Sequence, residues 1–432
     1  KRFNVPFEER EEFVKMKNVI HIKKGKHFIH YILAMLMIII CIHGNTQSQS
    51  FVPKDVEFKT NTLKRIGHRG DNWCITWVED GSQITSMCDG NWLYWSHRFH
   101  NHLYRIRGEA DNFKREHIPG YPHFSWDGQG WFGYGIYAVN GNIYSMVSRT
   151  QSDRWSGPFR GMKMLKSPDN GQTWYRMSRD GEERLLKPDD EAREEVNQEE
   201  MFFLEEFGET RGEVSAYPFS FCSFVQNGRN NNAAKDQYVY IYAPEGAYAH
   251  RLLLARVHQD SIEMRKTWEY FNGWNGNSPT WTDDINKREA AHVFPEKNEN
   301  DEYFGWYSWL PSIVWNPGLN LYIMVNGGTY AGDKMTGEAE EYFKNWMHKK
   351  TGSLGFWYSE NPYGPWKKFY YTDYWTVDDP GNRTYQPKLS PKWISEDGSK
   401  MILIWSDAMR NEEGRSHQVH YKWNQMEIEI KN

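Results

Sequence analysis

The sequence predicts an all-β protein, and three observations support this prediction. From residue 51 onward, short apolar or alternating runs are broken by Gly, Asp, Asn and Pro, which is the pattern of strands joined by tight turns. Long stretches with helical periodicity are scarce, and the segments 188–206 and 338–349 are the candidates for helical insertions. A turn followed by a tryptophan and then a strand also recurs, which indicates a repeated unit.

The repeated unit is marked by Trp174, Trp268 and Trp366, which are 94 and 98 residues apart. Half of this spacing is close to the length of one four-stranded propeller blade, roughly 40–50 residues. We therefore predict a single β-propeller of four-stranded blades over residues 51–432. Seven blades are favoured, with five or six as the alternatives.

Two further features fit a propeller. The N-terminal strands near residues 51–66 are expected to close the ring by pairing with residues 417–430. The segment SPDNGQTW fits the Asp-box turn S-x-D-x-G-x-T-W, which is common in sialidase-like propellers. Asp-boxes usually lie at the blade periphery, so we expect a structural role for Asp169.

The first 50 residues read as a targeting region. Residues 1–15 are predicted to be translated upstream sequence, because Met16 begins a basic segment followed by an apolar run at residues 31–42. That run is too short to span a bilayer but suits the core of a signal peptide. We predict a signal peptide at residues 16–48 and a secreted or periplasmic protein without stable membrane insertion.

Net charge and aromatic content indicate which kinds of molecule the protein could bind. The net charge of −5 implies no general attraction to nucleic acid. Aromatic residues make up 16% of the chain; packing between sheets accounts for most of them, but Trp and Tyr also provide the stacking surfaces that sugar-binding grooves need. We expect a monomer that binds an anionic polysaccharide and requires no cofactor. The metal content is unknown: the His417 and His420 pair lacks a convincing set of partner ligands, and a structural zinc or calcium stays open.

The stretch GDNWCITWVEDGSQITSMCDG at residues 70–90 organises the expected site. It predicts strands at 73–78 and 83–88, joined by a tight turn at Asp80-Gly81. Pairing about that turn brings Asp71 and Asp89 together at the open end of the hairpin. Cys74 and Cys88 would face each other across it, either as a disulfide or as two buried thiols.

Three chemistries fit the residues near this hairpin. β-Elimination on a uronic acid polymer needs a base, an acid and a group that neutralises the carboxylate. The cationic and titratable segment 97–123 and the polar loop around Arg229 could supply them. The candidate catalytic residues are His102, His123, Tyr217 and Arg229, and the candidate substrate-binding residues are Trp73, His100, Arg105 and Trp126.

The other two chemistries use different residues. Glycoside hydrolysis by paired carboxylates would use Asp71 and Asp89, with Glu245 as a third candidate. Asp beside Gly at strand ends is also ordinary turn chemistry. A non-catalytic carbohydrate-binding propeller would need only aromatic platforms, such as Trp92, Trp95, Trp126 and Trp131.

The hairpin stretch, together with NGRNNNAAKDQYVYIYAPEG and ENPYGPW, resembles a propeller family first known as a domain of unknown function, which includes bacterial arabinan-degrading glycoside hydrolases. It is also similar in architecture to the propeller ulvan lyases of marine bacteria. The resemblance covers most of residues 62–410. The lyase likeness implies two functional histidines about twenty residues apart, which fits His102 with His123 and equally His97 with His117. It also implies a tyrosine and an arginine downstream, which would be Tyr217 and Arg229. The hydrolase likeness implies catalysis by Asp71 and Asp89.

From these observations we predict an exported lyase that cleaves an ulvan-like, uronic-acid-containing polysaccharide. A glycoside hydrolase using Asp71 and Asp89 is the first alternative, and a carbohydrate-binding propeller is the second.

Overall fold

The structure is a computed structural model, and it describes residues 51–126, 130–149, 161–189, 201–204, 218–245, 248–295, 310–327, 352–379, 384–407 and 420–432. Within these residues the regular elements are β-strands and short 3-10 turns, with no α-helix. The predicted all-β class is therefore confirmed. No helix in the described part of the chain is long and apolar enough to cross a membrane. The predicted upstream segment 1–15 and signal peptide 16–48 lie outside the described residues.

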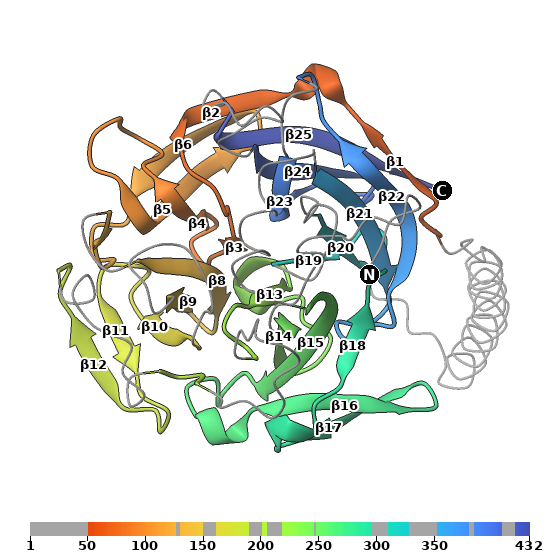
Figure 1. Ribbon diagram of the computed structural model, residues 1–432. Coiled ribbons are helices and arrows are strands. Elements are labelled where there is room, and N and C mark those ends of the chain that lie inside the picture. Colours follow the sequence, from red (N-terminus) through yellow and green to blue (C-terminus); the bar gives the residue numbers. More distant parts are fainter. Residues whose placement is uncertain are drawn as a thin grey trace, which may run out of the picture. The chain divides into compact units, whose positions relative to one another are not determined.

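The described strands form four hydrogen-bonded sheets, and the ten-stranded sheet divides at the parallel β13–β19 pair into two blades. This gives five blades in all, each with antiparallel strands (Figure 1). Blade I contains β3 (Ile75–Trp77), β4 (Gln83–Gly90), β5 (Phe99–Glu109), β6 (Asn112–His117) and the short β7 (Phe124–Ser125). Blade II contains β8 (Trp131–Val139), β9 (Asn142–Arg149), β10 (Lys163–Ser167), β11 (Trp174–Met177) and β12 (Glu183–Leu186). Blade III contains β13 (Ser223–Gln226), β14 (Tyr238–Glu245), β15 (Tyr248–His258), β16 (Glu269–Asn275), β17 (Ser278–Thr282) and β18 (Ala290–Val293).

The last two blades complete the ring. Blade IV contains β19 (Ser312–Asn316), β20 (Leu321–Asn326), β21 (Gly352–Ser359) and β22 (Lys367–Trp375). Blade V contains β23 (Thr384–Ile394), β24 (Lys400–Asp407), β25 (Lys422–Lys431), β1 (Asp55–Phe58) and β2 (Lys64–Arg69). The innermost strands β3, β8, β13, β19 and β23 each contact the next, and β23 contacts β3 (Figure 1). This closed cycle of contacts makes residues 53–432 a β-propeller.

The described residues form five blades rather than the favoured seven. Trp174, Trp268 and Trp366 stand at the start of the fourth strand in blades II, III and IV, and all three are buried. The repeat therefore spans one blade and not two. Halving it was wrong because additional strands and long connections make these blades about twice the usual length of roughly 40–50 residues.

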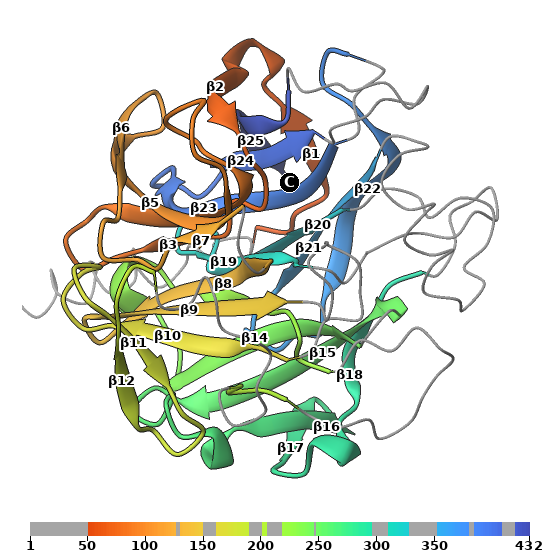
Figure 2. The ribbon, with the colours of Figure 1, turned by 60° about the vertical axis from the view of Figure 1, so that its left-hand side comes forward.

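The ring closes as the sequence predicted. β25 lies between β24 and β1, so the C-terminal strand is held by the N-terminal one (Figure 2). Val56 is opposite Ile430, and β2 pairs with the first half of β25, with Ile66 opposite Trp423. Blade V is held together by pairing between strands from the two ends of the described chain, so separating these strands would open the propeller.

The β3–β4 hairpin has the predicted register, with Ile75 opposite Thr85. In this register the Cys74 carbonyl accepts a hydrogen bond from the Ser86 amide, so Cys74 does not face Cys88. Cys74 and Cys88 are buried free thiols, and burial raises the pKa of both. Of the two alternatives for these cysteines, buried thiols are confirmed.

The Asp-box turn is structural, as expected. The Asp169 carboxylate accepts hydrogen bonds from the Gln172 and Thr173 amides, at 3.0 and 2.8 Å, and from the Thr173 hydroxyl. These bonds hold the turn that leads into Trp174, whose side chain is fully buried. The carboxylate therefore orders the backbone.

Candidate functional site

The two predicted carboxylates lie at the same end of blade I, at the open end of the β3–β4 hairpin. Asp71 precedes β3, and its backbone exchanges two hydrogen bonds with Cys88, at 2.9 and 2.8 Å. Asp89 follows Cys88 on β4 and has a positive φ of 57°. Because Asp71 pairs with the residue before Asp89, the two acidic residues occupy neighbouring positions on paired strands.

On one side, Asp71 lies near Lys388 of blade V. Lys388, on the innermost strand β23, is buried and donates a hydrogen bond to the Leu310 carbonyl at 2.9 Å. Burial lowers the pKa of Lys388, and the neighbouring Cys74 and Asp71 oppose that shift. Lys388 was not predicted from sequence, because it is more than 300 residues from Asp71 along the chain.

On the other side, Asp89 borders a cationic and aromatic group. Its Oδ1 atom lies 3.8 Å from Nδ1 of His100. The His100 ring is stacked on Trp126, with centroids 4.6 Å apart, and the Arg98 guanidinium lies 3.7 Å from the centroid of the same indole. Burial lowers the pKa of Arg98, and the nearby Arg69 lowers it further. Two of the predicted substrate-binding residues, His100 and Trp126, are thus placed beside a candidate carboxylate.

Several buried polar atoms at this end have no hydrogen-bond partner among the described residues. They are Asp89 Oδ1, Arg98 Nε, His100 Nδ1, Gln386 Oε1 and Asp407 Oδ2. Because buried polar atoms are normally hydrogen-bonded, such a group fits a place where a ligand or water completes the bonding.

Asp407 was not predicted from sequence. It ends β24, and its neighbour Ser406 donates a hydrogen bond to the Gly70 carbonyl at 3.1 Å, directly before Asp71. Trp405 donates a hydrogen bond to Asp407 Oδ1 at 3.3 Å. Burial raises the pKa of Asp407 to about 7. A buried carboxyl group with a raised pKa therefore lies next to the segment that contains Asp71.

The proposed lyase residues are only partly brought together: His102 and His123 are neighbours, but His102 is enclosed. His102 is 2% exposed, and neither of its ring nitrogens has a hydrogen-bond partner in the described part of the chain. Its ring lies against Phe99 and His117, with centroids at 4.5 and 5.0 Å. Burial lowers its pKa to well below the usual value, and the neighbouring His117 and His123 add to the effect. This enclosed histidine has no direct access to a polymer.

Of the other lyase candidates, His123 lies near His102, with ring centroids 6.4 Å apart, and Arg229 lies elsewhere. His123 is half-exposed, and its Nδ1 lies 3.4 Å from the exposed Asp189. Tyr217 lies outside the described residues. Arg229 is exposed in a 3-10 turn beside Gly81, at the turn end of the β3–β4 hairpin. His102 pairs with Met87, and the six residue spacings from Gly81 to Met87 correspond to roughly 20 Å along an extended strand. The expectation that His102 and Arg229 share one site is therefore contradicted.

Two predicted substrate-binding residues are structural instead. Trp73 is fully buried, donates a hydrogen bond to the Ser406 hydroxyl at 2.8 Å and packs on Trp92 and Trp423. Its ring fills the space between blades I and V and is closed to a sugar.

Arg105 belongs to the turn end of the hairpin. Its guanidinium donates hydrogen bonds to Ser82 at 2.7 Å, Asn170 at 2.9 Å and Asp80 at 3.2 Å. It therefore ties blade I to the Asp-box turn of blade II and cannot grip a substrate near Asp71.

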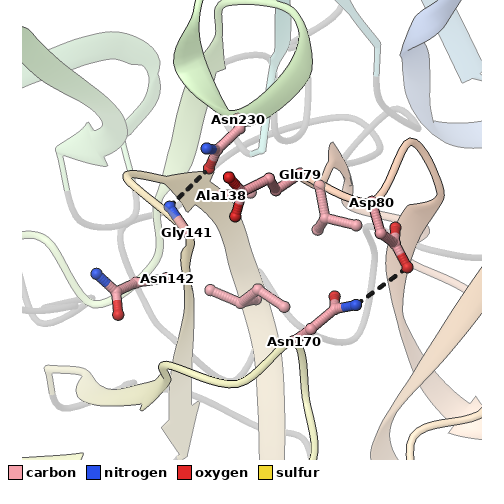
Figure 3. A pocket seen from close by; sticks show the side chains of 9 residues that line it. Glu79, Asp80, Ala138, Gly141, Asn142, Asn170 and Asn230 are labelled. Atoms are coloured by element: carbon pink, nitrogen blue, oxygen red, sulfur yellow. Dashed lines mark hydrogen bonds between the residues drawn. The ribbon is translucent and has the colours of Figure 1, made fainter.

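A small cavity at the turn end of the β3–β4 hairpin is also lined by carboxylates, but one of them is already bonded to neighbouring side chains. Figure 3 shows Glu79, Asp80, Asn142, Asn170 and Asn230 around a space of about 160 Å³. Asn170 donates a hydrogen bond to Asp80 Oδ2 at 3.0 Å, and Arg105 and Arg107 lie within 3.2 Å of the same oxygen. Asp80 therefore acts as a structural anchor, and we place the candidate site at the open end.

The described residues contain no group of three or more His, Cys, Asp or Glu side chains placed to hold a metal ion. His417, one of the two histidines considered as a ligand pair, lies outside them. Cys222 is buried, as expected for a core residue.

We expect the variant His102→Phe to keep at least half of the wild-type rate of polysaccharide cleavage, because the histidine is enclosed by aromatic rings. It should also lose less stability in acid. The folded protein holds His102 neutral, so this group costs stability as the pH falls below the ordinary histidine pKa near 6.5. Urea unfolding at pH 7.5 and pH 5 tests the second point. A 100-fold loss of activity with intact folding would restore His102 as a catalytic candidate.

Comparisons with known proteins give no family assignment. No family model matches the chain, and no curated protein matches it. Among solved structures, a putative hydrolase from Bacteroides ovatus shares 13% identity, with 84% of this chain and 87% of that chain covered and a TM-score of 0.45. An α-L-arabinofuranosidase from Podospora anserina shares 9% identity over 88% and 95% of the two chains, with a TM-score of 0.41. A GH43_1 enzyme from Xanthomonas citri shares 12% identity over 85% and 90%, with a TM-score of 0.40. The assignment as a propeller rests on the strand pairing described above.

Proposed function

We propose that the protein is a glycoside hydrolase that cleaves a polysaccharide carrying acidic groups. The observation that carries this proposal is the placement of Asp71 and Asp89 at adjacent positions of paired strands, at one end of blade I. Glycoside hydrolysis typically uses two carboxyl groups, one that protonates the leaving oxygen and one that activates water or attacks the sugar. Asp71 and Asp89 would supply these two groups.

The groups beside Asp89 support an acidic substrate. Arg69 lies close enough to Arg98 to disfavour the charge of Arg98, which Asp89 favours, and Arg98 Nε has no hydrogen-bond partner among the described residues. A carboxylate on the substrate would relieve this repulsion and accept a charge-assisted hydrogen bond from Arg98. Trp126, which contacts both Arg98 and His100, would hold these two side chains in position.

An exposed tryptophan near this end would provide the stacking surface. Trp95, in the β4–β5 loop, is 76% exposed, and its ring lies 4.5 Å from that of His68. An indole that presents its face to solvent beside a polar site is suited to packing against a sugar ring.

Hydrolysis is favoured over β-elimination because of where the side chains lie. The proposed base His102 is enclosed, and Arg229 stands at the turn end of the hairpin. The composition of residues 16–48 supports an exported enzyme, and we propose that it acts as a monomer.

The reaction can be identified by incubating the protein with arabinan, arabinoxylan and polygalacturonate. We expect new reducing ends without the ultraviolet absorbance of an unsaturated uronate. That absorbance appearing together with the reducing ends would show a lyase. Retention of the polysaccharide without any cleavage would show a binding protein. Either result would overturn the proposed hydrolase.

A further inference from the structure

A groove on the outer side of the propeller lies between blades III and IV. It is lined by Trp274, Gly276 and Asn277 from the β16–β17 hairpin and by Tyr358, Ser359, Glu360, Asn361, Pro365 and Lys367 from the β21–β22 region. Its volume is about 620 Å³, within the range of roughly 300–1,000 Å³ that is usual for ligand sites. No residue of the candidate active site lines it.

The groove presents an ordered aromatic surface. Trp274 is 37% exposed, although a tryptophan is usually largely buried. Its ring is held by Phe271, with centroids 5.3 Å apart, and by Tyr363 across the blade boundary at 6.3 Å. Tyr358 adds a second, half-buried ring. The Tyr358 ring lies 6.0 Å from that of Phe369, and Lys367 Nζ lies 5.6 Å from its centroid. Aromatic rings held by their neighbours can stack on a ligand with little loss of conformational entropy.

The rest of the lining is polar and balanced in charge. Asn277 and Asn361 provide amides that both donate and accept hydrogen bonds, while Glu360 and Lys367 provide one charge of each sign. This combination suits neither an apolar ligand nor a highly charged one. It suits a ligand that has hydroxyl groups on its rim and flat C–H faces, which is the chemistry of a sugar chain.

The turn that carries half of the groove is fixed in place. Tyr242 donates a hydrogen bond to the Pro362 carbonyl at 2.9 Å, and Trp366 donates one to the Tyr242 hydroxyl at 3.1 Å. Lys235 donates a hydrogen bond to the Glu360 carbonyl at 2.8 Å. The main chain of this turn is therefore engaged, while the Glu360 side chain is exposed at the groove. A preformed groove of this kind costs little to organise on binding.

We propose that this groove is a second carbohydrate-binding site, which holds a stretch of polysaccharide away from the catalytic end. The choice of a carbohydrate follows from the lining residues. The suggestion that the bound chain belongs to the same polymer that is cleaved rests on the proposed function.

Affinity electrophoresis in native gels that contain arabinan, arabinoxylan or polygalacturonate tests this proposal. The protein is used in the Asp71→Asn form, so that cleavage does not change the gel. We expect at least one polymer to retard it, and Trp274→Ala to weaken the retardation roughly fivefold or more. The matched control is Tyr374→Ala, which removes an aromatic side chain that is 53% exposed and does not line the groove. It should migrate like the parent protein.

Asn277→Trp provides a second variant if Trp274→Ala folds poorly. The larger side chain fills the groove from an exposed position and should also weaken the retardation. Unchanged retardation in both folded variants, or no retardation of the parent by any of the three polymers, would overturn the second site. Retardation that depends on Trp274, in a wild-type protein that cleaves nothing, would support the groove and refute only the proposed hydrolase.

Discussion

Replacing Asp71 with Asn should lower the rate of polysaccharide hydrolysis by about 10²–10⁴-fold, the range expected when a positioned acid or base is lost. The amide has nearly the same shape as the carboxylate but can neither take up a proton nor attack a sugar. The backbone hydrogen bonds between Asp71 and Cys88 do not involve the side chain, so the hairpin should stay intact. Release of reducing ends gives the rate, and thermal unfolding checks the fold.

Asp89→Asn should show a loss of the same order, and the double variant should lose little more than either single variant if both groups act in one step. Asp260→Asn is the matched control, because this aspartate is exposed and belongs to the β15–β16 connection. It should behave like the wild type. Full activity of the folded Asp71→Asn and Asp89→Asn proteins would remove both residues from the catalytic site.

Replacing Asp407 with Asn should stabilise the protein at alkaline pH. Burial raises the pKa of Asp407 from 3.8 to about 7, so the folded state binds this proton more tightly than the unfolded chain does. The stabilising effect of the bound proton is complete below the unfolded pKa and is lost as the pH rises through the folded pKa. Above pH 7 the ionised, buried carboxylate therefore costs on the order of 4 kcal/mol.

The measurement is the difference in the free energy of unfolding between Asp407→Asn and the wild type, obtained from urea denaturation at pH 5 and pH 8. This difference should grow in favour of the variant by about 3 kcal/mol between the two values. Because Trp405 donates to one carboxylate oxygen, the Asn carbonyl can accept the same hydrogen bond. A difference that does not change with pH would show that Asp407 has an ordinary pKa.

The sequence alone predicted most of the local structure around Asp71 and Asp89, although Asp71 pairs with Cys88 and Cys74 does not face Cys88. The Asp80-Gly81 turn determines the register of the β3–β4 hairpin, because a tight turn leaves a single way to pair the flanking strands. The same reasoning held for the Asp-box at Asp169 and for the closure of β25 by β1. In each case the signal was local, or it was the expected joining of the two chain ends.

The number of blades required the tertiary structure. The Trp174, Trp268 and Trp366 repeat was real, but its spacing included additional strands and long connections that have no fixed length. Loop length changes the free energy of folding only weakly, so insertions accumulate without altering the core. The spacing therefore could not distinguish one long blade from two short ones.

The sequence determined that this chain is an all-β propeller with two acidic residues at the open end of one hairpin. Tertiary structure decided which other side chains join them. Packing of the blades enclosed His102 and Trp73. It also brought Lys388 close to Asp71, and Ser406 to Gly70, from more than 300 residues away. The physical reason is that strand pairing within a hairpin is encoded by neighbouring residues. Burial and the resulting pKa shifts instead depend on the side chains that adjacent blades contribute, and these are distant in the sequence.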